Sequence, residues 1–274
     1  VERYRMTDQE ILETAATIKK SGIATCVLQS GEDSFYNADK ICRLVESIKE
    51  ETDLVLTLSI GERPASDYRA FAEAGANRYL LKHETASTEL YQYLRPGCRL
   101  DARVACLQTL KTLGFETGTG NMVGLPGQTP EILADDLLLM RMLDADMLGI
   151  GPFLPHPDTP LAGIENDGIE MTLRVIAIAR LLTRNTNIPA TTALATLHPQ
   201  GRLLALAAGA NVVMPDFTPE AYKRRYDIYP GRADVGSAEE IIKGLKKDFE
   251  SIGRTISTSV GNRPKTLNSE PTLH

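Results

Sequence analysis

Apolar, β-branched runs alternate with amphipathic helical patterns along most of the chain. Between consecutive runs, apolar residues recur at helical spacing, and several of these segments end in Gly. This alternation is typical of repeated β/α units, which place their strands side by side in a parallel sheet. The predicted strands are 23–30, 53–60, 78–84, 116–125, 147–154, 188–196 and 211–217.

The predicted helices fill the intervals between these strands. The first begins after Thr7, with Glu10 placed three residues on to complete a capping box. Because a helix comes first, a strand is expected before it. Seven strands and one missing strand would complete an α/β fold of the eight-stranded (β/α)8 TIM type, although a partial or open barrel fits the same count. The helices are 7–22, 38–51, 64–75, 100–113, 130–144, 171–182 and 201–209.

The β/α rhythm ends near residue 217. Beyond it the pattern predicts one helix, 238–251, and a polar end, SVGNRPKTLNSEPTLH, that is expected to fray. The chain is therefore divided into a β/α barrel over 1–217 and a C-terminal cap helix with a flexible tail over 218–274. We expect the barrel edge left by the missing first strand to be open and distorted.

Composition indicates how large a core the chain can form and which kinds of binding partner are unsuited to it. With 274 residues, 42% of them hydrophobic, the chain can bury one large core. A net charge of −6 without a long basic run argues against a nucleic acid or an anionic membrane as partner. No apolar stretch approaches the roughly 18 residues of a membrane span. Four scattered cysteines, without CxxC spacing, favour a reducing, cytoplasmic setting.

Polar residues follow the predicted strands, where β/α barrels carry their active sites. In QSGED (29–33) a Gly lets a ligand approach the backbone, and Glu32 and Asp33 can accept hydrogen bonds from an ammonium group. A tight turn is the alternative interpretation. In KHETA (82–86), His83 and Glu84 are suited to a ribose or charged ligand, while a helix cap with a solvated charge is the alternative.

Other candidates are weaker. GTGNMVG lies inside a predicted strand, so it is not a dinucleotide-binding loop. His156 and His198 lack nearby carboxylates at ligand spacing, which favours capping roles over a metal site. Arg103 falls within a predicted helix, where a solvated face is the ordinary interpretation. Three tyrosines share one helical face and either pack over the barrel mouth or reach its cavity: Tyr222, Tyr226 and Tyr229.

Taken together, eight strings resemble the HydE family of radical S-adenosylmethionine (SAM) maturases in order and spacing, from residue 1 to about residue 232. Biotin synthase and methylornithine synthase are similar more distantly. The strings are VERYRMT, VLQSGED, YLLKHETA, MVGLPGQT, GIGPFLPHPDTPL, NIPATTA, GANVVMP and YxxxYxxYPG.

The resemblance implies a radical SAM barrel that binds SAM and a [4Fe-4S] cluster, and it assigns site residues by motif. It places Arg103 near the SAM carboxylate, which replaces the solvated-face interpretation. No catalytic residue and no metal ligand within the chain is assigned. The implied SAM-binding residues are Gln29, Ser30, Glu32, Lys82, Glu84 and Arg103. The implied substrate-binding residues are Thr57, Thr191, Thr192, Met214, Tyr226 and Tyr229.

Two departures from the family pattern matter. Lys82 stands where the family usually has Arg, so a planar fork of donors becomes a point charge. The CxxxCxxC cluster loop is not in this chain, and its ligands are expected upstream of Val1. The full-length form is therefore expected to be active and this chain alone inactive. No Cys follows Cys106, so the chain as given lacks the accessory cluster of some relatives.

The function implied by the resemblance is generation of a 5′-deoxyadenosyl radical for maturation of the [FeFe]-hydrogenase active site. The expected substrate is a small sulfur-containing or iron-bound molecule, a cysteine synthon on the way to the dithiolate-bridged diiron precursor. Other hydrogenase maturases are expected partners. Two alternatives stay open: an HmdB-type maturase of the [Fe]-hydrogenase cofactor or another biotin synthase-like enzyme, and a cluster-free barrel that acts as a binding or scaffold protein.

Overall fold

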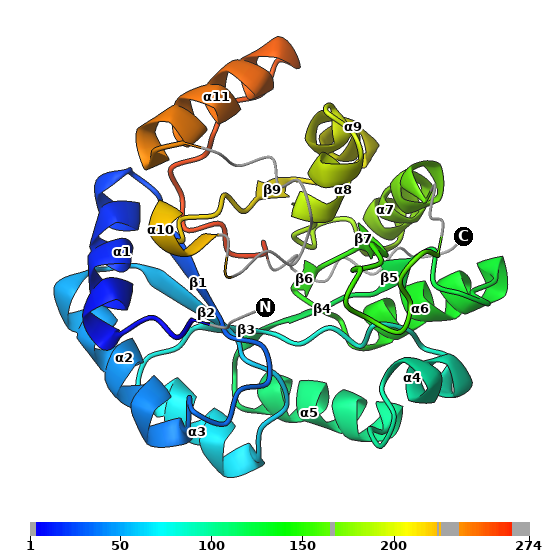
Figure 1. The fold of residues 1–274 in the computed structure, drawn as a ribbon, viewed down its shortest axis with the longest axis horizontal. Helices are drawn as coiled ribbons and strands as arrows, with labels where there is room; N and C mark the ends of the chain where they lie inside the picture. Colours follow the sequence, from blue (N-terminus) through cyan, green and yellow to red (C-terminus); the bar gives the residue numbers. More distant parts are fainter. Residues whose placement is uncertain (1–3, 165–167, 224, 226–235, 265–274) are drawn as a thin grey trace, which may run out of the picture.

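In the computed structural model, which describes residues 4–164, 168–223, 225 and 236–264, helices form an outer ring around short strands (Figure 1). The strands are β1 (Thr25–Gln29), β2 (Val55–Ser59), β3 (Arg78–Leu80), β4 (Glu116–Thr119), β5 (Met122–Val123), β6 (Met147–Leu148), β7 (Gly151–Pro152), β8 (Pro189–Ala190) and β9 (Val212–Val213). The helices are α1 (Asp8–Lys20), α2 (Ala38–Glu51), α3 (Ala65–Glu73), α4 (Thr88–Leu94), α5 (Leu100–Thr112), α6 (Pro130–Met142), α7 (Ile169–Thr183), α8 (Thr192–Leu197), α9 (Gly201–Ala208), α10 (Glu220–Lys223) and α11 (Ala238–Ser251).

Every described strand pair is parallel. Five strands form one sheet in the order β1-β2-β3-β4-β6, and two small pairs, β5–β7 and β8–β9, continue around the inside of the ring (Figure 1). Among the described strands, β1 and β9 are not hydrogen-bonded to each other. The predicted α/β class with parallel strands is confirmed, while closure by an eighth strand stays a prediction.

All seven predicted strands are longer than the strands of the structure, and three of the predicted runs are divided or continue into a helix. The run 116–125 divides into β4 and β5, and the run 147–154 divides into β6 and β7. The breaks fall where two backbones nearly touch, since a Cβ at Gly120 would lie 2.3 Å from the carbonyl oxygen of Gly149. The prediction of one strand over 188–196 was wrong beyond Ala190, because Thr192–Leu197 forms α8.

The helix predictions hold closely. Thr7 caps α1 in the predicted capping box with Glu10, and α11 covers the predicted 238–251. The sequence missed α4 and α10, which have 7 and 4 residues, because segments so short carry little periodicity. Among the described helices, none combines the length and apolar character that a bilayer crossing needs.

The strands present different chemistry on their two faces. Leu56 and Leu58 of β2 are fully buried and belong to the core cluster that includes Ile41 of α2 and Phe71 of α3. Thr57, between them, points to the opposite face, into the ring. Its parallel neighbour on β3 is Arg78. A second apolar cluster packs α6, α7 and α9 against the later strands. The apolar core therefore lies outside the strands, and polar side chains face the interior.

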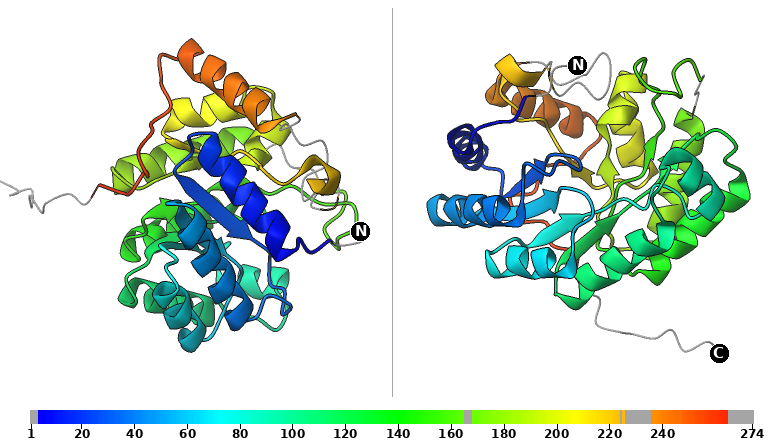
Figure 2. Two further views of the ribbon diagram at one scale, coloured as in Figure 1. Left: turned by 90° about the vertical axis from the view of Figure 1, so that its left-hand side faces the viewer. Right: turned by 60° about the horizontal axis from the view of Figure 1, so that its bottom comes forward.

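The segment after α11 runs along the N-terminal ends of the strands. The carbonyl oxygen of Val260 accepts hydrogen bonds from Thr25 Oγ1 of β1 (3.2 Å) and Arg78 Nη2 of β3 (2.7 Å). The left view in Figure 2 shows this red segment at the end of the barrel opposite the start of α1. Residues 265–274 of the expected frayed end lie outside the described residues, and the division at residue 217 stays a prediction.

Candidate functional site

The C-terminal ends of β1, β2 and β3 carry most of the charged site candidates. Parallel pairing puts these ends at the same side of the sheet. Gln29 at the end of β1 is exposed, Ser30 is half-buried, and Glu32 follows in the loop to α2. Lys82 and Glu84 lie just beyond β3, and both are half-buried. The structure thus brings the predicted SAM-binding positions to one end of the barrel.

Arg103 is buried, with 2% exposure, in the middle of this group. Its Nε lies 2.8 Å from Glu62 Oε1 and donates to the Tyr91 hydroxyl (3.1 Å), while Nη2 donates to Glu32 Oε1 (3.2 Å). The solvated-face interpretation of Arg103 was therefore wrong, because tertiary contacts from α4 and two strand-end loops enclose this face of α5. Two carboxylates, those of Glu32 and Glu62, therefore pair with the Arg103 guanidinium group.

Glu32 is held by two arginines. Arg95 Nη2 lies 2.8 Å from both of its carboxylate oxygens, and Arg103 contacts one of them. Partial burial disfavours the charged form, but the hydrogen bonds and charges of Arg95 and Arg103 outweigh it and lower the pKa of Glu32. Gly61 makes this packing possible, because a Cβ there would lie 2.1 Å from Glu32 Cγ. Glu32 is therefore an ionised acceptor at the rim of the site.

Glu84 occupies a strained turn. Its φ is 67°, and the Thr85 N–H donates to the His83 carbonyl two residues back (2.9 Å), which closes a γ-turn of the rare positive-φ form. Its side chain is 21% exposed and lies 3.4 Å from Lys82 Nζ. Within the described residues, Glu84 Oε2 makes no hydrogen bond. The oxygen nearest Lys82 Nζ is this same Oε2, so it is buried, has one ion-pair contact and makes no hydrogen bond among the described residues.

The predicted substrate residues are distributed over the interior and the later strands. Thr57 is buried in β2, and Thr191, Thr192 and Met214 are half-buried after β8 and β9. Thr191 Oγ1 is buried and has no hydrogen-bond partner among the described residues. It packs closely over Gly151 of β7, where a Cβ would lie 3.1 Å from the hydroxyl. Tyr226 and Tyr229 lie outside the described residues.

His83 lies away from the other candidates. The ring is fully buried, and Nδ1 lies 2.9 Å from Thr119 Oγ1 on the helix-facing side of β4. The alternative of a helix cap belongs instead to Ser87, whose hydroxyl accepts from the Leu90 N–H at the start of α4. His83 is thus a buried neighbour of the site, whereas Lys82 and Glu84 are the members of KHETA at the barrel end.

No group of three His, Cys, Asp or Glu side chains with metal-binding geometry exists within the described residues. His156 Nδ1 and His198 Nδ1 each accept a backbone N–H two residues on, at 3.1 Å, which is the predicted capping role. Burial raises the pKa of the Cys26 thiol to about 11. The four cysteines are all free thiols and do not form a cluster site in the part of the chain that is described.

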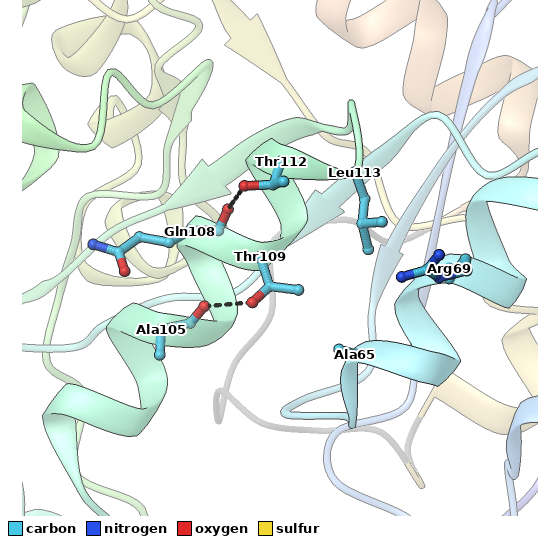
Figure 3. Close-up of a pocket in the computed structure, with 7 residues that line it drawn as sticks. All are labelled: Ala65, Arg69, Ala105, Gln108, Thr109, Thr112 and Leu113. Carbon is cyan, nitrogen blue, oxygen red and sulfur yellow. Dashed lines mark hydrogen bonds between the residues drawn. The ribbon is translucent and has the colours of Figure 1, made fainter.

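Two surface cavities lie elsewhere on the barrel. One, of 340 Å³, lies between α3 and α5, and the hydroxyls of Thr109 and Thr112 in its wall are already bonded to helix carbonyls (Figure 3). The other, of 250 Å³, lies between α6, α7 and Arg263 at the N-terminal ends of the strands. Neither cavity includes a predicted site residue.

Sequence reasoning missed four residues that organise the site: Glu62, Tyr91, Arg95 and Asp136. Glu62 directly follows a predicted strand and could have been found by the strand-end rule. Tyr91 and Arg95 lie on or next to the unpredicted α4. Asp136 is a polar residue within an apolar helix pattern, and only its burial in the folded chain distinguishes it from a solvated position.

Comparisons with known proteins agree with this arrangement. Residues 1–140 match the family model of the radical SAM superfamily. The [FeFe] hydrogenase maturase subunit HydE of Thermotoga maritima is 47% identical over 268 residues, covering 97% of this chain and 77% of HydE. A 3-methylornithine synthase of Methanosarcina barkeri is 32% identical over 255 residues, covering 92% of this chain and 71% of the synthase.

Solved structures agree on the fold. The crystal structure of methylornithine synthase (PylB) has a TM-score of 0.81 at 32% identity and covers 94% of this chain and 75% of its own. That of HydG, a maturase of the [FeFe]-hydrogenase, has a TM-score of 0.73 at 16% identity, with 90% and 57% covered, and supports the fold alone. From the family model and the extent of the HydE match, the chain belongs to the radical SAM superfamily and, within it, to the HydE family.

Proposed function

We propose that this chain is the barrel of a HydE-type [FeFe]-hydrogenase maturase that uses SAM to generate a 5′-deoxyadenosyl radical. The observation that carries this proposal is Glu84, whose strained turn beyond β3 holds a carboxylate oxygen that is paired with Lys82 but makes no hydrogen bond among the described residues. Identity of 47% to HydE over almost the whole chain supports the same choice among radical SAM reactions.

The residues at this end of the barrel fit SAM. SAM offers an ammonium group and ribose hydroxyls as donors, and Glu84, Gln29 and Ser30 offer acceptors at the strand ends. In this proposal Glu84 binds donor groups of SAM, and Lys82 beside it limits the excess negative charge. Arg103 is the cation for the SAM carboxylate. It is fixed by Glu62 and Glu32, so a bound carboxylate would have to share it with them.

The described cysteines do not fit a [4Fe-4S] cluster, because they form no group with metal-binding geometry among the described residues, so no step is assigned to this chain's thiols. In the family the cluster and SAM together supply a 5′-deoxyadenosyl radical. The contribution of this chain is to bind SAM, to orient it and to exclude water from the barrel interior.

We assign the substrate to the interior beside the later strands. In this proposal Thr57, Thr191 and Thr192 supply hydroxyl groups to the substrate, and Met214, Tyr226 and Tyr229 complete the set. The buried hydroxyl of Thr191 lacks a partner in the described residues and is available to donate to an anionic sulfur ligand. A small sulfur-containing or iron-bound substrate fits this set of hydroxyl groups. In this proposal the enzyme is cytoplasmic, and other hydrogenase maturases are its partners.

A second candidate is a carbon-skeleton reaction like that of 3-methylornithine synthase. The 32% identity and the TM-score of 0.81 favour it over a less similar radical SAM class. The two candidates demand different substrates in the same barrel. An amino acid substrate would need hydrogen-bond acceptors in the interior for its ammonium group. The threonine hydroxyls can accept such bonds, but they can also donate to an anionic substrate.

Product analysis separates these candidates. The native holoprotein would be reduced with dithionite in the presence of SAM and assayed for 5′-deoxyadenosine and for activation of [FeFe]-hydrogenase together with its partner maturases. We expect both. SAM cleavage without hydrogenase activation would reject the HydE-type substrate in favour of the second candidate or an HmdB-type maturase. A lack of SAM binding and cleavage would reject radical chemistry and leave the binding or scaffold role.

A further inference from the structure

Behind the KHETA turn lies a fully buried polar cluster to which the proposed function assigns no role. Asp136 of α6, Asn121 after β4 and His83 after β3 all have 0% exposure. Asp136 Oδ1 accepts the Ala86 N–H (2.5 Å), and Oδ2 accepts from Asn121 Nδ2 (2.7 Å). The sequence separations are 50 and 15 residues, so this contact exists only in the folded barrel.

A buried carboxylate needs a compensating reason to be retained. Transfer of a charge from water into the interior is costly unless hydrogen bonds replace the lost solvation. No Lys or Arg ion pair with Asp136 is formed in the described part of the chain. The nearest cationic candidate is His83, whose Nε2 lies 3.7 Å from Oδ1, beyond hydrogen-bond length. Apolar residues on α6 would pack here at lower cost, so Asp136 is explained better by what it positions.

The cluster holds Glu84 from both sides. Ala86, two residues after Glu84, is fixed by Asp136 Oδ1. Asn121 is fixed by Oδ2, and its backbone pairs with Glu84 in an isolated parallel bridge. The Glu84 N–H donates to the Gly120 carbonyl, and the Glu84 carbonyl accepts the Met122 N–H, both at 3.0 Å. The ring of His83 fills the space between Thr119 and Asp136.

Glu84 needs such support because its backbone conformation is unfavourable. A non-glycine residue at φ 67° inside a γ-turn is strained and persists only where surrounding contacts determine its conformation. Without the bond to Ala86, the turn can relax to an ordinary extended form, which would carry the Glu84 carboxylate away from the barrel end.

We propose that Asp136, with His83 beside it, is a positioning residue that fixes the Glu84 turn and thereby sets SAM affinity. The inference rests on the proposed function in one respect, namely that Glu84 binds SAM. Asp136 itself is fully buried and touches no ligand. Its effect on SAM must therefore pass through Glu84, which makes the two residues energetically coupled.

The test is a double-mutant cycle on SAM binding, measured by calorimetric titration of the unreduced native holoprotein. We expect Asp136→Ala to weaken SAM binding about tenfold, by loss of a charge-assisted hydrogen bond to the turn. In a Glu84→Gln background the same change should have almost no further effect. Asp136→Asn retains the acceptor for Ala86 and, after rotation of the Asn121 amide, its bond to Asn121, so it should recover most of the affinity.

Thr186→Val is the matched control, since Thr186 is equally buried and bonds to the Ala145 carbonyl at the far end of the barrel. It should lower thermal stability without changing SAM affinity. An equal loss from Asp136→Ala in the wild-type and Glu84→Gln backgrounds would overturn the inference. If Asp136→Ala does not fold, His83→Gln in the same two backgrounds decides by the same criterion. A Glu84→Gln protein with full SAM affinity would instead reject the proposed function.

Discussion

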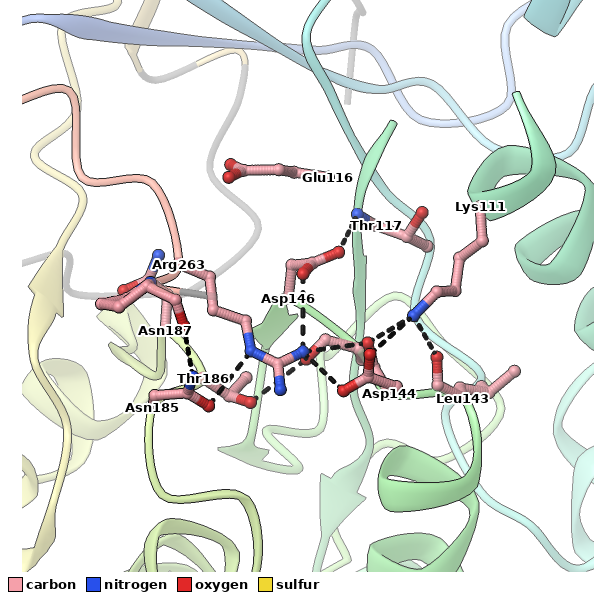
Figure 4. A network of polar contacts seen from close by, with 12 residues as sticks. Lys111, Glu116, Thr117, Leu143, Asp144, Asp146, Asn185, Thr186, Asn187 and Arg263 are labelled. Atoms are coloured by element: carbon pink, nitrogen blue, oxygen red, sulfur yellow. Dashed lines mark hydrogen bonds and ion pairs between the residues drawn. The ribbon is translucent and has the colours of Figure 1, made fainter. Parts of the chain in front are cut away.

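The two ends of the barrel differ in how completely their polar groups are satisfied. At the C-terminal ends of the strands, Glu84 Oε2 and Thr191 Oγ1 have no hydrogen-bond partner among the described residues. At the N-terminal ends, Arg263 of the C-terminal segment contacts the Asp144 and Ala145 carbonyls and the Asp146 carboxylate within a dense network (Figure 4). One end retains binding capacity, while the other uses its polar groups to join segments.

The difference indicates a division of labour between the ends. Buried polar groups normally find partners, so those left without one mark either a cost in stability or a place reserved for a ligand. In β/α barrels the C-terminal ends carry chemistry and the N-terminal ends carry stability. Variants at the upper end should therefore change binding more than folding, and variants at the lower end should do the reverse.

The largest effect is expected for Glu84→Gln, which keeps the shape and removes the charge. Hydrogen bonds to charged groups contribute about 1.5–3 kcal/mol, so SAM affinity should fall roughly 10- to 100-fold. The melting temperature should stay nearly constant, because the nearby Lys82 pair is partly exposed. Calorimetric titration and thermal unfolding give both numbers. If Glu84→Gln lowered the melting temperature but left SAM affinity unchanged, the C-terminal end of the barrel would serve stability and not binding.

At the opposite end, Arg263→Ala should destabilise the fold by about 2–3 kcal/mol, because it leaves the two carbonyls and Asn185 without their donors. SAM affinity should not change. Chemical denaturation measures the loss, and Lys247→Ala on the exposed face of α11 is the matched control. An unchanged unfolding free energy would mean that the C-terminal segment does not hold the barrel.

A pair of threonines gives a sharper, smaller comparison. Thr186 Oγ1 donates to the Ala145 carbonyl (3.2 Å), so Thr186→Val should cost about 1 kcal/mol. Thr191 Oγ1 has no partner in the described residues, so Thr191→Val should be neutral or slightly stabilising and should weaken substrate binding. Unfolding of the two variants under identical conditions decides. Equal losses would show that Thr191 is bonded in solution.

The smallest expected effect is the pH dependence of the stability that Asp144 contributes. Burial opposes ionisation of Asp144, but Arg263 and Lys111 outweigh it and lower its pKa. The carboxylate therefore contributes stability above its unfolded pKa of about 3.9, and this contribution disappears as pH falls through the lower native pKa. Since Asp144 is largely exposed, we expect Asp144→Asn to cost no more than about 1 kcal/mol at pH 7, and the cost should be smaller at pH 2 because the native carboxylate then begins to protonate. Urea unfolding at both pH values measures it.

The sequence alone determined the order of the β/α units, most helix positions and the family. These features depend on local periodicity and on short strings, so they are readable without coordinates. It also indicated that charged residues after the strands would meet at one end, because parallel strands share a direction. The positions of Glu32, Lys82 and Glu84 follow that rule.

Tertiary structure decided the contacts between distant segments. Asp136 meets Ala86, and Arg263 meets Asp144, across separations of 50 and 119 residues, and neither pair leaves a local signature. From the helical pattern around it, Arg103 is expected on a solvent-exposed face, yet α4 and two loops enclose its side chain. Burial and hydrogen-bond satisfaction are properties of the assembled barrel, since they depend on which segments arrive from elsewhere in the chain.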